Sequence, residues 1–364
     1  MASSEQDGTA LAAAAQQFGS MSLGKSVERK DTENNENKNE TPTKLCSACG
    51  KKSDALKKCT ACKCVWYCDK DCQKRHRGEH KTECKLVKKE LDKRGGKLDV
   101  GTEKDIGPLG KLPPREECPI CMRAMPIHEG LRAYSLCCGK MICAGCGHQH
   151  KIQTRKANVT RAQMQQPPVP LTCAFCREPR SISDEEMLAR LSKRVELKDP
   201  LALCNMGLYY RYGGLGLPAD QTKCIDLLRE SAGLGCSVAQ YQLGAFHSTG
   251  AMGIEKNEEE ELKYWKKAAE GGDLLSQHNL GGMAHVKGEH VAAMRHWRLS
   301  ASGGFTVSMC YVIECFEKSL LHHGDLAETL QAFYLARAEL RSENRDQYIA
   351  YLKRTGEYEE RFDL

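Results

Sequence analysis

The placement of cysteine constrains this chain more than any other feature of its sequence. Of 21 cysteines among 364 residues, sixteen lie between Cys46 and Cys176, mostly in closely spaced pairs. The N-terminus "MASSEQDGTALAAAAQQF" lacks a basic start followed by a long apolar run, so we expect no secretory signal. No segment approaches the ~18 apolar residues of a membrane span. We therefore expect an intracellular protein of the cytoplasm and/or nucleus, in which clustered cysteines indicate metal binding or catalysis rather than disulfides.

The first cysteine block, residues 46–84, has the spacing of a metal-binding module. Its ligand pairs are Cys46 and Cys49, Cys59 and Cys62, Cys68 and Cys72, and His80 and Cys84. A C-x-x-C turn directs two thiolates at one ion, and zinc takes four nitrogen or sulfur ligands in a tetrahedron. A block of 39 residues buries too little surface to fold alone. Zinc would supply the missing folding energy, on the order of 10 kcal/mol per site.

The stretches "CSACG", "CTACKCVWYC", "DCQKRH" and "EHKTEC" together resemble a MYND zinc finger. The resemblance implies two interleaved sites, which would be Cys46, Cys49, Cys68 and Cys72, and Cys59, Cys62, His80 and Cys84. Cys64 is left over, either as a small buried residue or as an alternative ligand. MYND fingers bind proline-containing peptides through a glutamine and a tryptophan one helical turn apart. Gln73 matches the first position, but Arg77 stands at the second, so the flat apolar platform is missing.

The second cysteine block, residues 118–177, contains "CPIC", "CCGKMICAGC" and "CAFCR" and resembles a RING finger with a variant middle. Lys140 stands where an ordinary RING finger has a histidine ligand, and the adjacent Cys137 is the expected substitute. The implied sites are Cys118, Cys121, Cys143 and Cys146, and Cys137, Cys138, Cys173 and Cys176, with His148 or His150 as replacements for Cys137. Together the two blocks would bind four zinc ions, two per finger.

Resemblance to a RING finger implies ubiquitin ligase activity, in which the finger holds a ubiquitin-conjugating enzyme in a reactive pose. Ile120 and Arg177 match two of the contact positions of that family. His150 lies near the aromatic position, and Ala174 replaces the proline. The alternative is a zinc-stabilised interaction module without ligase activity, because fold does not determine function.

From about residue 184 the cysteine pairs end and a helical repeat begins. Three units between about 200 and 304 align by recurring small residues, and each is expected to be a helix, a glycine-containing loop and a second helix. The glycine positions are spaced by 37 and 37, and the alanine positions by 37 and 32, so the third unit has lost five residues from its loop. The recurring residues are Gly207, Gly244, Gly281, Ala232, Ala269 and Ala301. The pattern resembles Sel-like repeats, relatives of tetratricopeptide repeats, and implies an α-solenoid.

The remaining segments are connectors and ends. Residues 1–44 include "KDTENNENKNETPTK", which is too polar to bury surface, so we expect disorder. Residues 85–117 form a basic linker whose first part could extend a helix to about Lys93. The tail, 305–364, is expected to be a helix pair that caps the solenoid, with Gly324 as a break and Asp325 as an N-cap.

The predicted architecture is mainly α, with small zinc-stabilised MYND and RING-like modules followed by an α-solenoid of Sel-like helix pairs at 184–304. We expect a non-enzymatic adaptor that binds other proteins or peptides. The alternative is a RING-type ubiquitin ligase whose solenoid selects the substrate. A net charge of +6, with both signs interspersed, does not indicate a nucleic-acid partner, and no membrane partner is expected.

Overall fold

The described residues of the computed structural model are 45–53, 55–93, 95, 107–181 and 183–358, and they belong to one unit, Lys44–Leu364. The tail expected to be disordered, 1–44, lies outside these residues, as does most of 94–106 in the linker. Within the described part of the chain, no helix combines the length and the apolar character needed to cross a membrane.

The first cysteine block folds as a small hairpin followed by a long helix. Strands β1 (Lys57–Lys58) and β2 (Trp66–Tyr67) pair antiparallel, and α2 (Lys70–Lys93) follows. The Asp69 carboxylate accepts a hydrogen bond of 2.8 Å from the backbone N–H of Cys72, which satisfies one of the free donors at the start of the helix. The helix ends at Lys93, where the sequence predicts its end. We call residues 45–93 the first finger.

The second cysteine block contains η1 (Glu129–Leu131), an antiparallel hairpin of β3 (Arg132–Tyr134) and β4 (Met141–Cys143), and α3 (Ala144–Gln163). The loop after α3 is fastened to it by Asn158, whose side chain exchanges hydrogen bonds of 2.9 and 2.8 Å with the backbone of Val169. We call residues 118–177 the second finger.

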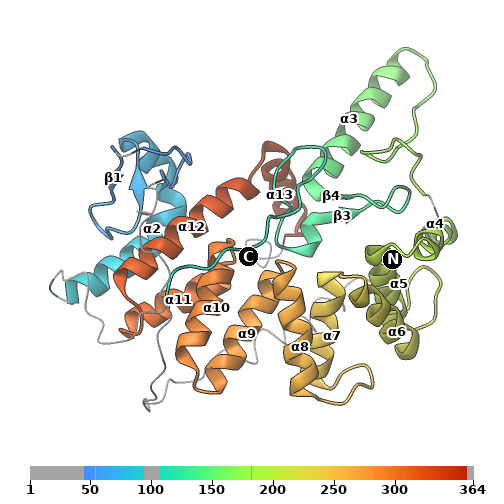
Figure 1. Cartoon of the computed structure of the whole chain (residues 1–364). Coiled ribbons are helices and arrows are strands. Elements are labelled where there is room, and N and C mark those ends of the chain that lie inside the picture. Colours follow the sequence, from blue (N-terminus) through green and yellow to red (C-terminus); the bar gives the residue numbers. More distant parts are fainter. Residues whose placement is uncertain (1–44, 54, 94, 96–106, 182, 359–364) are drawn as a thin grey trace. The chain divides into compact units, whose positions relative to one another are not determined.

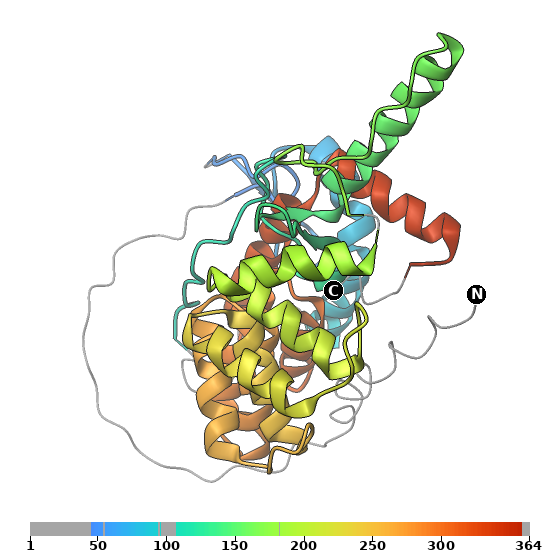
Figure 2. The same cartoon turned by 90° about the vertical axis from the view of Figure 1, so that its right-hand side faces the viewer.

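The repeat region begins with α4 (Asp184–Glu196) and continues as consecutive helix pairs that pack side by side (Figures 1 and 2). The pairs are α5 (Pro200–Tyr212) with α6 (Gln221–Gly233), α7 (Ser237–Thr249) with α8 (Glu258–Glu270), and α9 (Leu274–Val286) with α10 (His290–Ser302). Their loops, 213–220, 250–257 and 287–289, show that the third pair lacks five residues, as the sequence spacing predicts.

The recurring glycines lie where the two helices of a pair approach most closely. A methyl group at Gly281 would stand 2.5 Å from Cδ1 of Trp297, and one at Gly207 would stand 3.1 Å from the carbonyl oxygen of Cys224. Trp265 and Trp297 are both buried in the solenoid core. The recurring glycines therefore mark the positions at which the two helices of a pair are in close contact.

The described part of the tail forms three helices instead of the expected pair: α11 (Thr306–Glu317), α12 (His323–Leu340) and α13 (Glu343–Thr355). The additional break comes at Ser342, whose hydroxyl caps α13. The predictions of a break at Gly324 and of a helix start at Asp325 were wrong, because α11 ends at Glu317 and α12 begins at His323, so both residues lie in the first turn of α12. There the carboxylate of Asp325 forms an ion pair of 3.1 Å with the buried Arg298 of α10.

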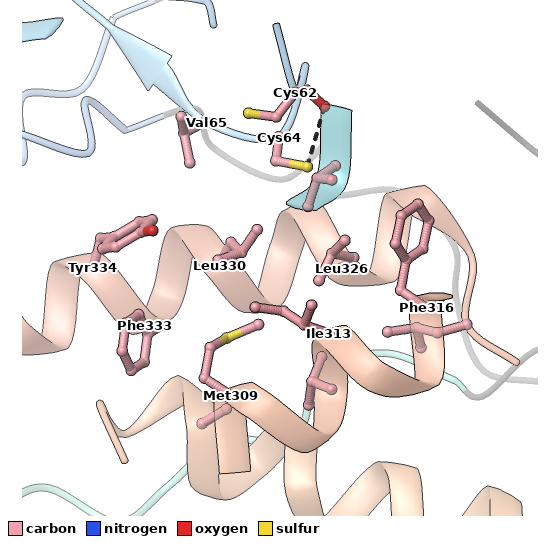
Figure 3. Close-up of a cluster of buried hydrophobic side chains, with 14 of the residues drawn as sticks. Cys62, Cys64, Val65, Met309, Ile313, Phe316, Leu326, Leu330, Phe333 and Tyr334 are labelled. Carbon is pink, nitrogen blue, oxygen red and sulfur yellow. Dashed lines mark hydrogen bonds between the residues drawn. The ribbon is translucent and has the colours of Figure 1, made fainter. Parts of the chain in front are cut away.

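One hydrophobic core joins the first finger to the end of the chain. In Figure 3, Cys64 and Val65 lie over α12, next to Leu326 and Leu330, and side chains of α11 pack against the opposite side of that helix. The tail also reaches the second finger, because α13 packs against α3. The tail therefore does more than close the solenoid, since each finger rests on one of its helices.

Candidate metal centres

Within the described residues, four groups of cysteine and histidine side chains each bring their ligand atoms within 4.8 Å of one another. Site 1 is Cys46, Cys49, Cys68 and Cys72; site 2 is Cys59, Cys62, His80 and Cys84; site 3 is Cys118, Cys121, Cys143 and Cys146; and site 4 is Cys137, Cys138, Cys173 and Cys176. These are the interleaved sets that the two sequence resemblances imply.

The geometry of the groups fits zinc. All the described cysteines are free thiols, and neighbouring sulfur atoms within the groups lie 3.3 to 3.9 Å apart. Four Zn–S bonds of about 2.3 Å directed to the corners of a tetrahedron would place the sulfur atoms about 3.8 Å apart. Thiolates so close together repel one another unless a cation lies between them. Each group is thus suited to one ion.

Site 1 is built from a tight turn and the start of α2. The turn closes through a hydrogen bond of 2.8 Å from the Gly50 N–H to the Cys46 carbonyl, and Gly50 has φ +71°, a left-handed conformation that favours glycine. On the helix side, Arg75 donates a hydrogen bond of 3.1 Å to the sulfur of Cys72. This cation lies beside the negative charge that zinc-bound thiolates would carry.

Site 2 is buried against α12, which orients its histidine. The Nε2 atom of His80 lies 3.3 Å from the sulfur of Cys62, and the Nδ1 atom lies 3.2 Å from the hydroxyl of Tyr334. That hydroxyl donates a hydrogen bond of 3.1 Å to the carboxylate of Glu83. The Tyr334 oxygen is therefore free to accept the Nδ1 proton of His80, which leaves Nε2 for the metal. Burial and the Glu83 carboxylate both raise the pKa of Tyr334, so its hydroxyl stays protonated.

Two further histidines surround site 2 without joining it. His323 of α12 lies 2.9 Å from the carbonyl oxygen of Cys62 and 3.3 Å from the sulfur of Cys64, which is buried and lies outside all four groups. His76 accepts a hydrogen bond of 3.0 Å from Tyr67 in the tautomer that leaves Nδ1 unprotonated. Burial, with a smaller contribution from His80, lowers the pKa of His76 to about 4, so it is neutral at physiological pH.

Site 3 is covered by the start of α13. Asn344 directs its side-chain amide at the sulfur of Cys146, at 3.6 Å, and Arg345 directs its guanidinium at the sulfur of Cys121, at 3.8 Å. The helices meet at Gly145, where a methyl group would stand 2.7 Å from the backbone nitrogen of Arg345. Asn344 and Arg345 are not predicted from the sequence, since nothing in their spacing connects them with the cysteines.

At site 4 the structure brings Cys137, rather than either histidine, to the group. His148 instead lies against the rings of Tyr348 and Tyr351, with centroid distances of 5.1 and 4.5 Å. His150 forms hydrogen bonds with Thr172, at 3.1 Å, and with Arg177, at 3.3 Å.

The residues predicted to contact partners have different surroundings. Ile120 is 40 % exposed, and Phe175, which no pattern singled out, is 42 % exposed. Arg177 is exposed and contacts His150, as described above. Gln73 is half-buried, with its amide 4.0 Å from the sulfur of Cys59, while Arg77 is exposed. Gln73 thus lies beside site 2.

Comparison with known families identifies two of the modules. Residues 46–84 match the MYND finger model, and residues 200–236 and 237–273 match the Sel1 repeat model. The chain thus contains a MYND finger and Sel1 repeats, which are zinc-binding and protein-interaction modules, and the pair α9–α10 repeats the Sel1 geometry.

Similar solved structures include a Sel1 repeat protein and a protein with an SLR fold. A Sel1 repeat protein from Oxalobacter formigenes is 26 % identical, with a TM-score of 0.32, over 35 % of this chain and 97 % of its own length. A protective antigen of uropathogenic Escherichia coli with an SLR fold is 19 % identical, with a TM-score of 0.27, over 46 % of this chain and 48 % of its own.

Proposed function

We propose that this protein is an adaptor in which zinc ions fold two fingers against a helical-repeat surface, so that one chain binds several partner proteins. The observation that supports this role is the position of the tail helices. Helix α12 contacts both α10 and the first finger, and α13 contacts the second finger. An adaptor requires its binding modules to be joined, and these helices join them.

The ligand sets favour structural zinc over a catalytic metal. Each site offers four sulfur or nitrogen ligands, which fill a tetrahedron and leave no position for substrate or water. The thiolates would be ligands and not nucleophiles. A zinc ion at each site would contribute folding energy, which the fingers need because of their small size.

The zinc content is measured by native mass spectrometry of the full chain. We expect four ions, and three after Cys173→Ser, which removes one ligand of site 4. A wild-type count of two or three would mean that the second finger lacks one or both sites. That result would also remove the basis for ligase activity.

Ubiquitin ligase activity is the second candidate, and the exposed apolar surface of the second finger supports it. Ile120 and Phe175 could contact a conjugating enzyme, and Arg177 adjoins the same module. The test is discharge of ubiquitin from charged conjugating enzymes. An adaptor leaves the rate unchanged. A ligase accelerates it, and Ile120→Ala and Arg177→Ala remove the acceleration, whereas Leu197→Ala, an exposed residue after α4, retains it.

Cross-linking of the full chain to its partners in cell extract tests the adaptor role directly. We expect cross-links from a finger and from the repeat region within the same complexes, and release of the finger-bound partners by a chelator. Cross-links that only ever involve a single module would contradict the adaptor role.

A further inference from the structure

Residues 107–115, expected from the sequence to be a plain connector, lie along the third helix pair of the solenoid. We call this segment the strap. It contains no helix or strand. Arg298 of α10 donates a hydrogen bond of 3.1 Å to the carbonyl of Gly107, and a methyl group at Gly110 would stand 3.6 Å from Cδ1 of Leu299. The strap is therefore docked on the repeats at its beginning.

The next strap residues pack on two turns that connect successive helices. A methyl group at Gly303, in the turn after α10, would stand 2.9 Å from Cδ1 of Leu112. One at Gly272, in the turn after α8, would stand 3.0 Å from Cγ of Pro113. The side chains of Leu112 and Pro113 are half-buried, whereas Lys111 and Pro114 are exposed. A segment in which some side chains contact the protein and others face solvent is typical of an extended peptide bound in a groove.

Arg115 anchors the end of the strap. Its guanidinium donates a hydrogen bond to the carbonyl of Gly303, and the carboxylate of Glu339 on α12 supplies an opposing charge. The Nη1 atom is buried and has no hydrogen-bond partner among the described residues. An unsatisfied buried donor is unfavourable, and it weakens the attachment of the strap to the turns.

The docking surface ends at the first repeat unit. Leu234 occupies the position equivalent to Gly271 and Gly303, and its side chain is 48 % exposed. A methyl group at the neighbouring Gly235 would have no atom within 4 Å. The strap therefore contacts two turns that contain paired glycines and does not extend to the turn that contains a leucine.

We propose that the turns at 271–272 and 303–304 form a docking site for an extended Leu-Pro-Pro-Arg peptide. The strap fills this site within the chain, and a partner protein with such a segment binds after displacing it. This inference rests on the proposed interaction role and names the peptide class that the repeats bind. A tethered segment acts at an effective concentration of about 1 mM, so a peptide with a dissociation constant near 10 µM for the open site binds the wild type roughly 100-fold more weakly.

The experiment is fluorescence anisotropy with a labelled peptide of residues 107–117, titrated with the full chain. We expect saturable binding to a Leu112→Ser, Arg115→Ser variant and at least tenfold weaker binding to the wild type. A scrambled peptide should bind neither protein. In the variant background, Glu339→Lys should weaken binding several-fold through repulsion of the peptide arginine, whereas Glu196→Lys, an exposed charge on α4, should not.

Equal affinity for both proteins, or no binding to a folded variant, would overturn the docking site. Zinc content and circular dichroism establish whether the variant is folded, and Arg115→Ala alone serves if the double variant is not, with the same order of affinities. If the peptide does not bind the folded variant but partner proteins still cross-link to the repeat region, the docking site is wrong and the adaptor role stands. If both fail, the adaptor role is also wrong.

Discussion

Tyr334 follows the histidine that it orients by 254 residues. At the scale of single residues, the candidate zinc sites depend on such distant side chains as well as on their ligands. The hydroxyl of Tyr334 determines which nitrogen of His80 faces the metal, and Arg345 lies against a sulfur atom of site 3. Residues of this kind change how tightly a metal is held without contacting it.

Tyr334→Phe should accelerate zinc loss from site 2, because the ring packing is retained while the hydrogen bond to His80 is lost. We expect one of the zinc ions to transfer to a chromophoric chelator about 10-fold faster than in the wild type. Tyr264→Phe, in the repeat region, is the control and should leave all the rates unchanged. Identical kinetics for Tyr334→Phe and the wild type would show that the hydroxyl does not support the metal.

His278 should make the solenoid sensitive to acid. Burial lowers its pKa to about 4, and Ser308 lies 2.9 Å from its Nδ1 atom. Between pH 6.5 and 4 the unfolded chain therefore binds more protons than the folded chain, so the free energy of unfolding decreases as the pH falls. From pH 7 to pH 5 we expect a loss of about 1 kcal/mol, allowing for partial exposure of the ring. Denaturant titrations of His278→Gln should show a loss smaller by this amount, and equal losses would exclude the residue.

At the scale of elements, the packing of each helix pair depends on glycines, whose missing side chains let the two helices approach closely. Gly281 and Gly282 are neighbours in α9, but only Gly281 faces a tryptophan of α10. A repeated glycine in a helix is unfavourable unless packing requires it. The sequence spacing therefore revealed a contact between helices as well as the helices themselves.

Alanine substitution of these two glycines should have opposite effects. Gly281→Ala forces a methyl group into Trp297 and should destabilise the fold by about 1–3 kcal/mol. Gly282→Ala has no neighbouring atom within 4 Å of the added methyl and should stabilise the helix by about 0.5–1 kcal/mol. Thermal denaturation of the two variants checks the difference, and the same sign for both would contradict the packing argument.

At the scale of the whole molecule, metal and helix packing are coupled. The first finger and α12 share a hydrophobic core. Loss of zinc from the finger should therefore destabilise α12, although the four ligand groups contain no residue of that helix. Hydrogen exchange with added chelator should show faster exchange in α12, residues 323–340, than in the zinc-bound protein. Helix α6, which packs chiefly against α5 and α7 among the described helices, should be unchanged. Protection of α12 that is independent of chelator would show that the core survives without metal.

Ligand spacing and glycine periodicity are local patterns, and from them the sequence predicts the cysteine groups, the helix pairs and the shortened third loop. What it misses depends on contacts between distant segments. The strap has no periodic pattern because it is extended. From the sequence alone Asp325 resembles a helix cap, but in the structure its carboxylate forms an ion pair with Arg298. Ser342, followed by Glu343 and Asp346 in the first turn of α13, is a local helix-start signal that the prediction of a helix pair did not use. Only the contact of α13 with α3 shows where that helix packs.

The first finger packs on α12, a helix that is synthesised long after the finger itself. The cysteines of site 2 leave the ribosome early, but Tyr334 is translated 254 residues after His80. At about 5–20 residues per second this interval lasts roughly 13 to 50 seconds. During that time the nascent finger exposes the apolar surface that α12 later covers. Zinc that binds during this interval does so before the final packing, and a message truncated before α12 yields a finger that lacks the helix on which it packs.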